Sequence, residues 1–206
     1  MICRLKKISE PLRLCPHNGT YDNGSKDDFM RALLINPYYP ISETPSPPLG
    51  LAFLAGALES AGIEVQILDL VVFPYTKHNL EQIISDFNPH LVGATAVTMN
   101  FSHAACVLQD VKSLAPHIIT IMGGPHVSFC AQDTLAEYPQ IDVIVMGEGE
   151  NTIVELARSC RDKNSWDQIK GIAYRTHDGI GSTAPRDPIA NIDDLPDPAR
   201  HLIPMG

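Results

Sequence analysis

The sequence lacks the features that mark iron–sulfur sites, disulfide scaffolds and membrane spans. Its five cysteines lie far apart, at positions 3, 15, 106, 130 and 160, and form neither a CxxC nor a CxxxCxxC motif. This odd, scattered set predicts free thiols in a reducing compartment and encodes no three-cysteine iron–sulfur site. No segment approaches the roughly 18 apolar residues of a membrane helix, and the basic N-terminus has no apolar signal region. We therefore expect a cytoplasmic protein.

Positive charge and phosphate-binding motifs are scarce as well. Lysine and arginine total 15 against 24 aspartates and glutamates, which gives a formal net charge of −9. An acidic chain without a basic run is poorly suited to a nucleic acid or an anionic membrane, so neither is an expected partner. No GxGxxG follows the first predicted strand, and GxxxxGK[ST] is absent.

What the sequence does contain is a regular alternation of apolar runs and helical patterns. Strands are predicted at residues 31–36, 64–70, 91–97, 118–124 and 142–146, and helices at residues 48–61, 79–88, 101–115, 131–139 and 151–160. Continuously apolar strands indicate a parallel sheet covered by helices on both faces. We therefore predict an α/β, Rossmann-like (flavodoxin-like) five-stranded sheet of order 2-1-3-4-5.

The two ends of the chain differ in texture from this central unit. Residues 1–28 are rich in turn formers and charge, and predict a flexible extension. Residues 29–168 form the predicted cofactor-binding domain. Residues 169–206 predict a hairpin around the "HDG" turn, followed by a proline-rich connector without a core pattern that lies on the surface.

Ligands of an open parallel sheet bind outside the carboxyl ends of the strands, where the strand order reverses. The loops at that edge are built from small, rigid and mostly uncharged residues. Threonine hydroxyls there suit amides or a phosphate, and glycines let a ligand approach the backbone. The candidate binding residues are Asn36, Pro37, Tyr38, Tyr39, Leu49, Gly50, Thr95, Ala96, Val97, Thr98, Met99, Asn100, Gly123, Gly124, Pro125, His126, Gly147, Glu148, Gly149 and Glu150.

Each of these motifs also has a purely structural explanation. Glycines after parallel strands commonly form tight turns, Thr95 and Thr98 suit a sheet edge, and a lone histidine such as His126 is commonly a surface residue. Tyr38 and Tyr39 suit a cap over the core. The prediction of a site therefore depends on the convergence of four such loops at one edge.

Five motifs in order resemble the N-terminal cobalamin-binding domain of cobalamin-dependent radical S-adenosylmethionine enzymes. They are "NPYYP…PPLGLAFLAGALESAGIEVQILD", "GATAVTMNF", "GGPHVSF", "DVIVMGEGENTIVEL" and "GIAYR…DLPDPARHLIP", and together they span residues 31–204. The resemblance implies cobalamin as the cofactor, with the corrin over the carboxyl ends of the strands and the nucleotide tail beside the sheet.

The resemblance also assigns places to the candidate residues. Residues 95–100 would lie beneath the corrin, Gly123 and Gly124 would make room for the tail, residues 147–150 would close the far side, and residues 36–39 and 48–50 the near side. Replacing Gly123 or Gly124 by valine is expected to abolish cofactor retention and to leave the fold largely intact.

The lower face of cobalt is the point at which this sequence differs from methionine-synthase-type domains. Those domains carry DxHxxG after the first strand, whereas the loop here contains no histidine. The resemblance therefore implies base-off binding without a histidine ligand. The lower face would be open, water-bound, or met by Met99 or Asn100.

The sequence ends before the cluster motif that such enzymes carry in a following barrel. It is therefore expected to be an excised domain or a module that works with a radical S-adenosylmethionine partner, as the corrinoid part of a methyltransferase-type system. Two other functions stay open: a flavodoxin-like protein that binds flavin or a nucleotide, and an interaction domain without a cofactor.

Overall fold

The computed structural model describes residues 29–39 and 46–203 of the chain. The predicted extension at residues 1–28 lies outside these residues. Within the described part, no helix combines the length and apolarity that crossing a bilayer requires.

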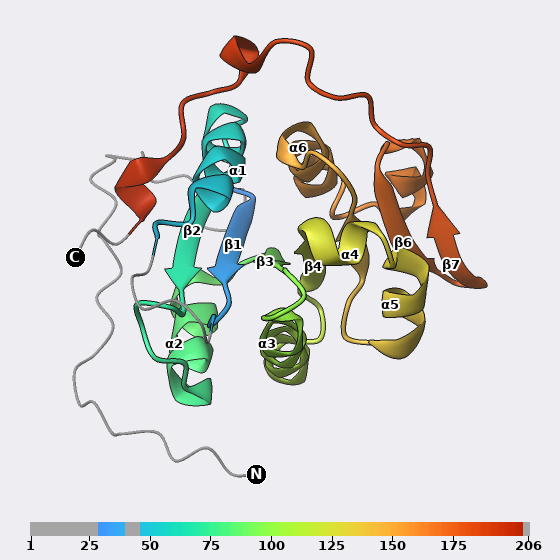
Figure 1. Ribbon diagram of the computed structural model, residues 1–206. Coiled ribbons are helices and arrows are strands. Elements are labelled where there is room, and N and C mark those ends of the chain that lie inside the picture. Colours follow the sequence, from blue (N-terminus) through green and yellow to red (C-terminus); the bar gives the residue numbers. More distant parts are fainter. Residues whose placement is uncertain (1–28, 40–45, 204–206) are drawn as a thin grey trace.

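Five parallel strands form the centre of the fold, as the sequence predicts (Figure 1). Their backbones pair in the order β2-β1-β3-β4-β5, so neighbours in sequence are joined by crossovers through helices. Their bounds are β1 Arg31–Asn36, β2 Glu64–Asp69, β3 Leu91–Thr95, β4 Ile119–Gly123 and β5 Val143–Val145.

The sheet has seven strands, and the expectation of a five-stranded sheet is wrong in this respect. The predicted hairpin forms, as β6 Ile172–Thr176 and β7 Gly179–Ser182, but β6 pairs antiparallel with β5 and extends the same sheet. The physical reason is that β5 is only three residues long and would otherwise expose its outer edge. Ile172 and Ala173 are fully buried on β6, which completes the core on both faces.

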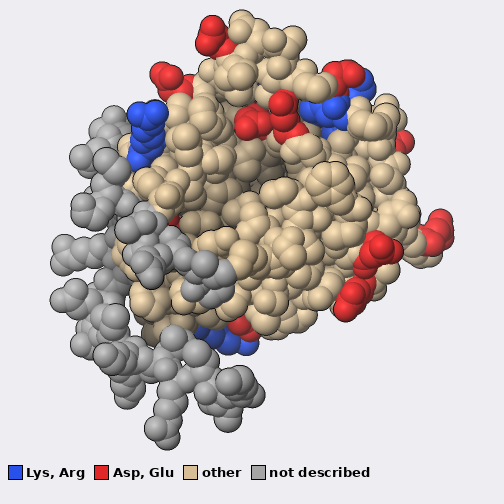
Figure 2. Space-filling model, viewed as in Figure 1, with Lys and Arg blue, Asp and Glu red and all other residues tan. Residues whose placement is uncertain are grey.

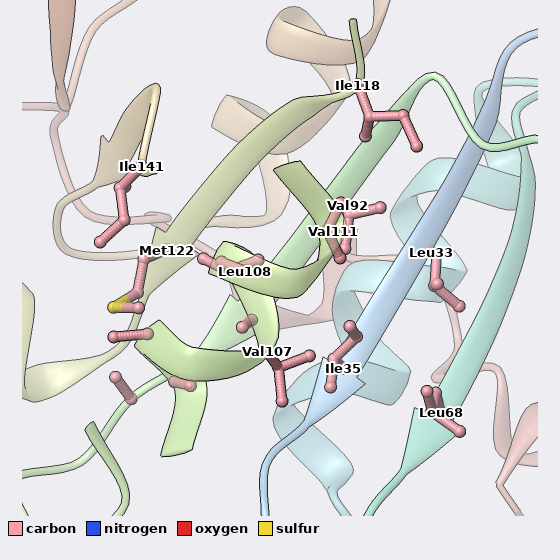
Figure 3. Packing of buried hydrophobic residues seen from close by; sticks show 14 of the residues in the cluster. Leu33, Ile35, Leu68, Val92, Val107, Leu108, Val111, Ile118, Met122 and Ile141 are labelled. Atoms are coloured by element: carbon pink, nitrogen blue, oxygen red, sulfur yellow. The ribbon is translucent and has the colours of Figure 1, made fainter. Parts of the chain in front are cut away.

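Helices cover both faces of this sheet. One face packs on α1 Leu49–Ser60 and α6 Glu150–Arg158, and the other on α2 Lys77–Phe87, α3 Phe101–Leu114 and α5 Ala131–Glu137. Each face thus has its own core: the first core lies under α1 and α6, and the second under α2, α3 and α5. Figure 3 shows the second core, in which Leu33, Val92 and Met122 of the strands meet Leu108 and Val111 of α3. A short helix, α4 Pro125–Ser128, follows β4 directly and was not predicted.

Two polar groups tie helix α3 to its neighbours. Lys112 donates from Nζ to Asp142 at 2.5 Å, and the same carboxylate oxygen accepts from the backbone N–H of Thr120 at 2.9 Å. Two residues earlier on the same helix, Asp110 accepts from the Tyr75 hydroxyl. Burial and the neighbouring carboxylate raise the pKa of Tyr75 well above its usual value.

The segment after α6 adds a large side chain to the first core. A 3-10 helix, η1 Lys163–Gln168, buries Trp166 with 1% of its surface exposed. The indole N–H donates to the Ser159 carbonyl at 3.2 Å, and the ring packs edge-on against Tyr174.

Residues 183–203, here called the strap, run from β7 over the α1 and α6 side of the molecule (Figure 1). The strap contains η2 Ile192–Asp194 and η3 Arg200–Leu202, and its end is seated on α1. Ala199 donates from its backbone to the Ala52 carbonyl at 2.9 Å, and Ile203 is 95% buried. The expectation that this segment has no core pattern is therefore wrong for its last residues.

The seat for the strap depends on one glycine. A Cβ placed on Gly56 would lie 2.2 Å from the Asp197 carbonyl oxygen, closer than real contacts allow. Because Gly56 has no side chain, the strap backbone can lie directly on helix α1.

Candidate functional site

The candidate site begins with two glycines that remove side chains from one face of the sheet. Gly93 on β3 lies between Leu34 on β1 and Ile121 on β4. Two residues nearer the carboxyl edge, Gly123 on β4 pairs with Thr95 on β3. Alternate residues of a strand share a face, so both glycines face α1 and α6. A Cβ at Gly123 would have its nearest neighbours at 3.8 Å, an ordinary van der Waals distance, and both glycines border an open space.

That open space is a cavity of about 350 Å³ between the sheet and helices α1 and α6. Its volume falls at the lower end of the range for small-molecule pockets, about 300–1,000 Å³. The space-filling view is hollowed between the two helices, with acidic and basic atoms along the upper edge of the hollow and mainly uncharged atoms along the rest (Figure 2). The lining residues are Leu34, Asn36, Pro48, Gly50, Leu51, Leu54, Gly93, Ala94, Thr95, Ile121, Gly123, Gly124, Val145, Gly147, Glu148, Gly149, Glu150 and Ile153.

Polar side chains of this lining occur only in its upper part, which is the part at the carboxyl edge of the sheet; the part further back along the strands is called the lower part. Asn36 ends β1, and its amide donates to Asp69 at 2.9 Å, which holds the carboxamide in place. Thr95 ends β3. Glu148 lies in the turn before α6, and Glu150 is the first residue of that helix. Two residues further down the strands, the lining is entirely aliphatic or glycine.

Outside the cavity, the loop after β1 meets the loop after β3. The Tyr39 hydroxyl donates to the Met99 sulfur at 3.4 Å, and the Tyr38 ring contacts the His103 ring edge-on at 5.5 Å. Tyr38 and Met99 remain nearly half exposed despite their size. These contacts form an apolar rim at the carboxyl edge of the sheet.

A second set of contacts joins the loop after β3 to helix α4. His126 Nδ1 lies 3.1 Å from the Thr98 hydroxyl, its backbone N–H donates to the Ala96 carbonyl, and its ring packs against Phe101 at 4.6 Å. The sequence alone could also explain His126 as a surface residue. In the structure, its side chain and its backbone both contact candidate residues of the β3 loop, Thr98 and Ala96.

The two adjacent glycines at the end of β4 have different roles. Gly124 has a φ of +105°, and a Cβ there would lie 2.6 Å from the Ala96 carbonyl oxygen. A side chain at Gly124 would therefore displace the backbone of the β3 loop. The expectation that Gly124→Val leaves the fold largely intact is wrong, whereas Gly123 is the position at which a side chain would fill the cavity.

Three further candidate residues make contacts that narrow their roles. Glu148 accepts from the backbone N–H of Ile189 in the strap at 2.6 Å, so one wall of the cavity is bonded to the strap. Asn100 is 4% exposed, and its side-chain oxygen accepts from Val97 N–H at 2.8 Å within its own turn. Met99, next to it, is the more exposed of the two side chains suggested for cobalt's lower face.

The structure brings the candidate residues to one edge in two groups. Nine line the cavity: Asn36, Gly50, Thr95, Gly123, Gly124, Gly147, Glu148, Gly149 and Glu150. Tyr38, Tyr39, Ala96, Val97, Thr98, Met99, Asn100 and His126 form the loop contacts beside it. Pro37 follows β1, and Leu49 and Pro125 are the first residues of α1 and α4; none of the three contributes to the cavity lining.

Sequence reasoning missed the aliphatic wall of the cavity, which includes Leu34, Leu51, Ile121 and Ile153. These residues have the composition of ordinary core positions. Their only signal in the sequence is the presence of Gly93 and Gly123 on the neighbouring strand positions, which line the same cavity without side chains.

A mostly parallel sheet with a glycine-floored cavity at the carboxyl edge defines an α/β domain of the class that binds its ligands at that edge. A sequence profile of the family described as B12 binding domain matches residues 42–157, more than half of the chain. The chain therefore belongs to this family, and cobalamin is its cofactor.

Curated relatives agree with this membership. An uncharacterized methyltransferase of Pyrococcus horikoshii is 36% identical over 162 residues, which cover 79% of this chain and 35% of the relative. An anaerobic magnesium-protoporphyrin IX monomethyl ester cyclase of Rubrivivax gelatinosus is 34% identical over 176 residues, 80% of this chain and 31% of that enzyme. The chain thus spans about a third of the length of these relatives.

Solved structures show the same fold. The radical S-adenosylmethionine methyltransferase TsrM of Kitasatospora setae, with cobalamin and a [4Fe-4S] cluster bound, is 26% identical and superposes with a TM-score of 0.66. The match covers 76% of this chain and 31% of TsrM. OxsB, a cobalamin-dependent S-adenosylmethionine radical enzyme, gives a TM-score of 0.72 at 20% identity over 84% of this chain and 24% of OxsB.

Proposed function

We propose that this chain binds cobalamin in the base-off form and serves as the corrinoid module of a radical S-adenosylmethionine methyltransferase-type system. The corrin would lie over the carboxyl edge of the sheet, and the nucleotide tail would enter the cavity between the sheet and helices α1 and α6. When bound, cobalamin supplies a cobalt that can carry a methyl group.

The observation that carries this proposal is the cavity beneath the edge. Its volume suits one arm of a large cofactor and is too small for an entire corrinoid, so the ring is left at the rim. Gly93 and Gly123 line the cavity on the sheet side without side chains, and the residues present therefore fit a ligand with a flat disc and a trailing arm. Tyr38 and Met99 offer exposed apolar surface for the disc.

The absence of a histidine in the β1 loop supports the base-off proposal without a protein imidazole on cobalt. The described residues between β1 and α1 are Pro37, Tyr38, Tyr39, Ser46, Pro47 and Pro48, and none is a histidine. Two histidines lie near the edge, but His126 is bonded to Thr98 and His103 packs against Tyr38. Met99 is the favoured side chain for the lower face, because Asn100 is buried and its oxygen is used within its own turn.

The relatives support the methyltransferase part of the proposal. One is named a methyltransferase, and TsrM contains both cobalamin and a [4Fe-4S] cluster. Since this chain covers about a third of each, the cluster and S-adenosylmethionine would be provided by a partner domain or protein.

The proposal is tested by mixing the purified chain with hydroxocobalamin, with flavin mononucleotide, or with neither, followed by desalting. Retention of a base-off cobalamin spectrum is expected. Retention of flavin in place of cobalamin would favour the flavodoxin-like alternative, and retention of neither would refute cofactor binding.

Gly123→Val tests where the tail lies. Gly123 lines the cavity and its new Cβ would lie 3.8 Å from the nearest protein atoms, so the fold should survive while cobalamin retention is lost. Ala136→Val, on the exposed side of α5, is the matched enlargement and should retain cobalamin. Unchanged retention by Gly123→Val would move the tail elsewhere.

The lower face is tested by electron paramagnetic resonance of the Co(II) form. No nitrogen superhyperfine coupling is expected, and the spectra of His126→Ala and His103→Ala should match that of the unsubstituted protein. Coupling that disappears in either variant would contradict the proposed absence of a histidine ligand.

A further inference from the structure

The lower part of the cavity contains no side chain that can form a hydrogen bond. Its surface is made by Leu34, Leu51, Leu54, Gly93, Ala94, Ile121, Gly123, Val145 and Ile153. Leu34, Ile121 and Ile153 are each at least 97% buried. The polar lining residues Asn36 and Thr95 lie two residues beyond Leu34 and Gly93, which is roughly 6.6 Å along a strand.

The backbone of this part is equally closed to a ligand. Strand β3, which forms the floor, pairs with β1 on one side and β4 on the other, so its N–H groups are used within the sheet. Among the described residues, Gln66 Oε1 is the buried side-chain polar atom that lacks a partner, and Gln66 does not line the cavity. Neither the side chains nor the β3 backbone therefore offers a free donor or acceptor to a polar ligand there.

Natural cobamides share the corrin and differ in the base at the end of the nucleotide tail. The base is dimethylbenzimidazole in cobalamin, adenine in some relatives, and a phenol such as p-cresol in others. Adenine carries an exocyclic amino group and extra ring nitrogens where dimethylbenzimidazole carries methyl groups. In an aliphatic cavity those polar groups lose their water without gaining partners.

From this composition we infer that the chain discriminates between cobamides by their lower base, and that it selects apolar bases and rejects adenine. The inference rests on the proposed entry of the tail into the cavity. The cavity wall, especially Val145, Ile121 and Ile153, determines this specificity, because each presents only hydrocarbon to the base.

The experiment compares dissociation constants of four corrinoids with the full chain: cobalamin, p-cresolyl cobamide, adenine-containing cobamide, and cobinamide, which lacks the base. A phenolic base cannot coordinate cobalt, so the p-cresolyl form removes the contribution of base detachment from the comparison. Adenine-containing cobamide should bind about 5- to 150-fold more weakly than cobalamin, since an unsatisfied buried polar group typically has that effect. Cobinamide should bind more weakly than cobalamin and p-cresolyl cobamide.

Val145→Thr provides a second measurement. It exchanges a methyl for a hydroxyl of nearly the same size on the cavity wall, and should reduce the preference for cobalamin over adenine-containing cobamide by about 2- to 10-fold. Val143→Thr makes the same change on the same strand, at a buried position outside the lining, and should leave the preference unchanged.

The outcomes separate this inference from the proposed function. If cobalamin binds and adenine-containing cobamide binds equally well or better, the specificity is overturned while cobalamin binding stands. If cobinamide binds as tightly as cobalamin, the tail does not use the cavity and the inference is overturned. If no corrinoid binds, the proposed function fails and the inference fails with it.

Discussion

Gly56→Ala offers a direct test of how the strap is held on helix α1. The new methyl carbon would lie 2.2 Å from the Asp197 carbonyl oxygen, and side-chain carbons essentially never approach closer than 3.0 Å. The strap must therefore move by at least about 0.8 Å. That shift would lengthen the hydrogen bond from Ala199 to Ala52 beyond its usual range.

The expected loss follows from the contacts at the seat. The hydrogen bond contributes about 0.5–1.5 kcal/mol, and full exposure of Ile203 would remove about 1.5–3 kcal/mol. Replacing a helical glycine by alanine returns about 1 kcal/mol. With Ile203 fully exposed, the free energy of unfolding should fall by about 1–3.5 kcal/mol, or Tm by about 2–14 °C.

Urea or thermal unfolding measures this change, and hydrogen exchange at residues 197–203 should accelerate in the variant. Gly50→Ala, in the first turn of the same helix, is the matched control because its new Cβ meets no atom within 4 Å. It should be neutral or slightly stabilising. If Gly56→Ala is as stable as the control, the strap is not seated on α1 as described.

Three other outcomes follow from the described contacts. Asp142→Asn should lower the free energy of unfolding by about 2–3 kcal/mol, because it weakens a largely buried ion pair, whereas Asp187→Asn at an exposed pair should change it by less than about 1 kcal/mol; equal losses would contradict this difference in burial. Stability should decline as the pH rises above about 10, because Tyr75 ionises in the unfolded state before it does so in the folded state. In Tyr75→Phe the unfolding midpoint should fall less steeply with rising pH above about 10. An unchanged dependence on pH would exclude this tyrosine as its source. A thiol reagent at pH 8 should modify the exposed Cys106 much faster than Cys160, whose pKa is raised by burial; peptide mass spectrometry measures both rates, and equal rates would refute the burial of Cys160.

The parallel part of the fold could be predicted because its signals are local. Runs such as residues 31–36 and 91–95 are continuously apolar, which is how doubly covered strands appear in a sequence. The strand order then followed from right-handed crossovers. The union of β6 with β5 could not be predicted, because the pairing of a hairpin with a distant edge depends on which edge is left exposed.

The candidate site was predictable at its glycines and not at its walls. Gly123 stands out because a glycine ends a strand, but a sequence does not distinguish a glycine that opens a cavity from one that makes a turn. The φ of Gly124 and its contact with Ala96 show that both kinds occur side by side. Leu34 and Ile121 resemble any other core residue until the fold sets them around empty space.

Trp166 has a practical consequence for studies of this protein. It is the chain's single tryptophan, it is 1% exposed, and it sits in the core that also contains the cavity-lining Ile153. Its fluorescence therefore originates from one dry, rigid position on a known side of the sheet. Corrinoids absorb in the near-ultraviolet region where indole emits, so loading of the protein can be followed in real time as quenching, without any attached dye.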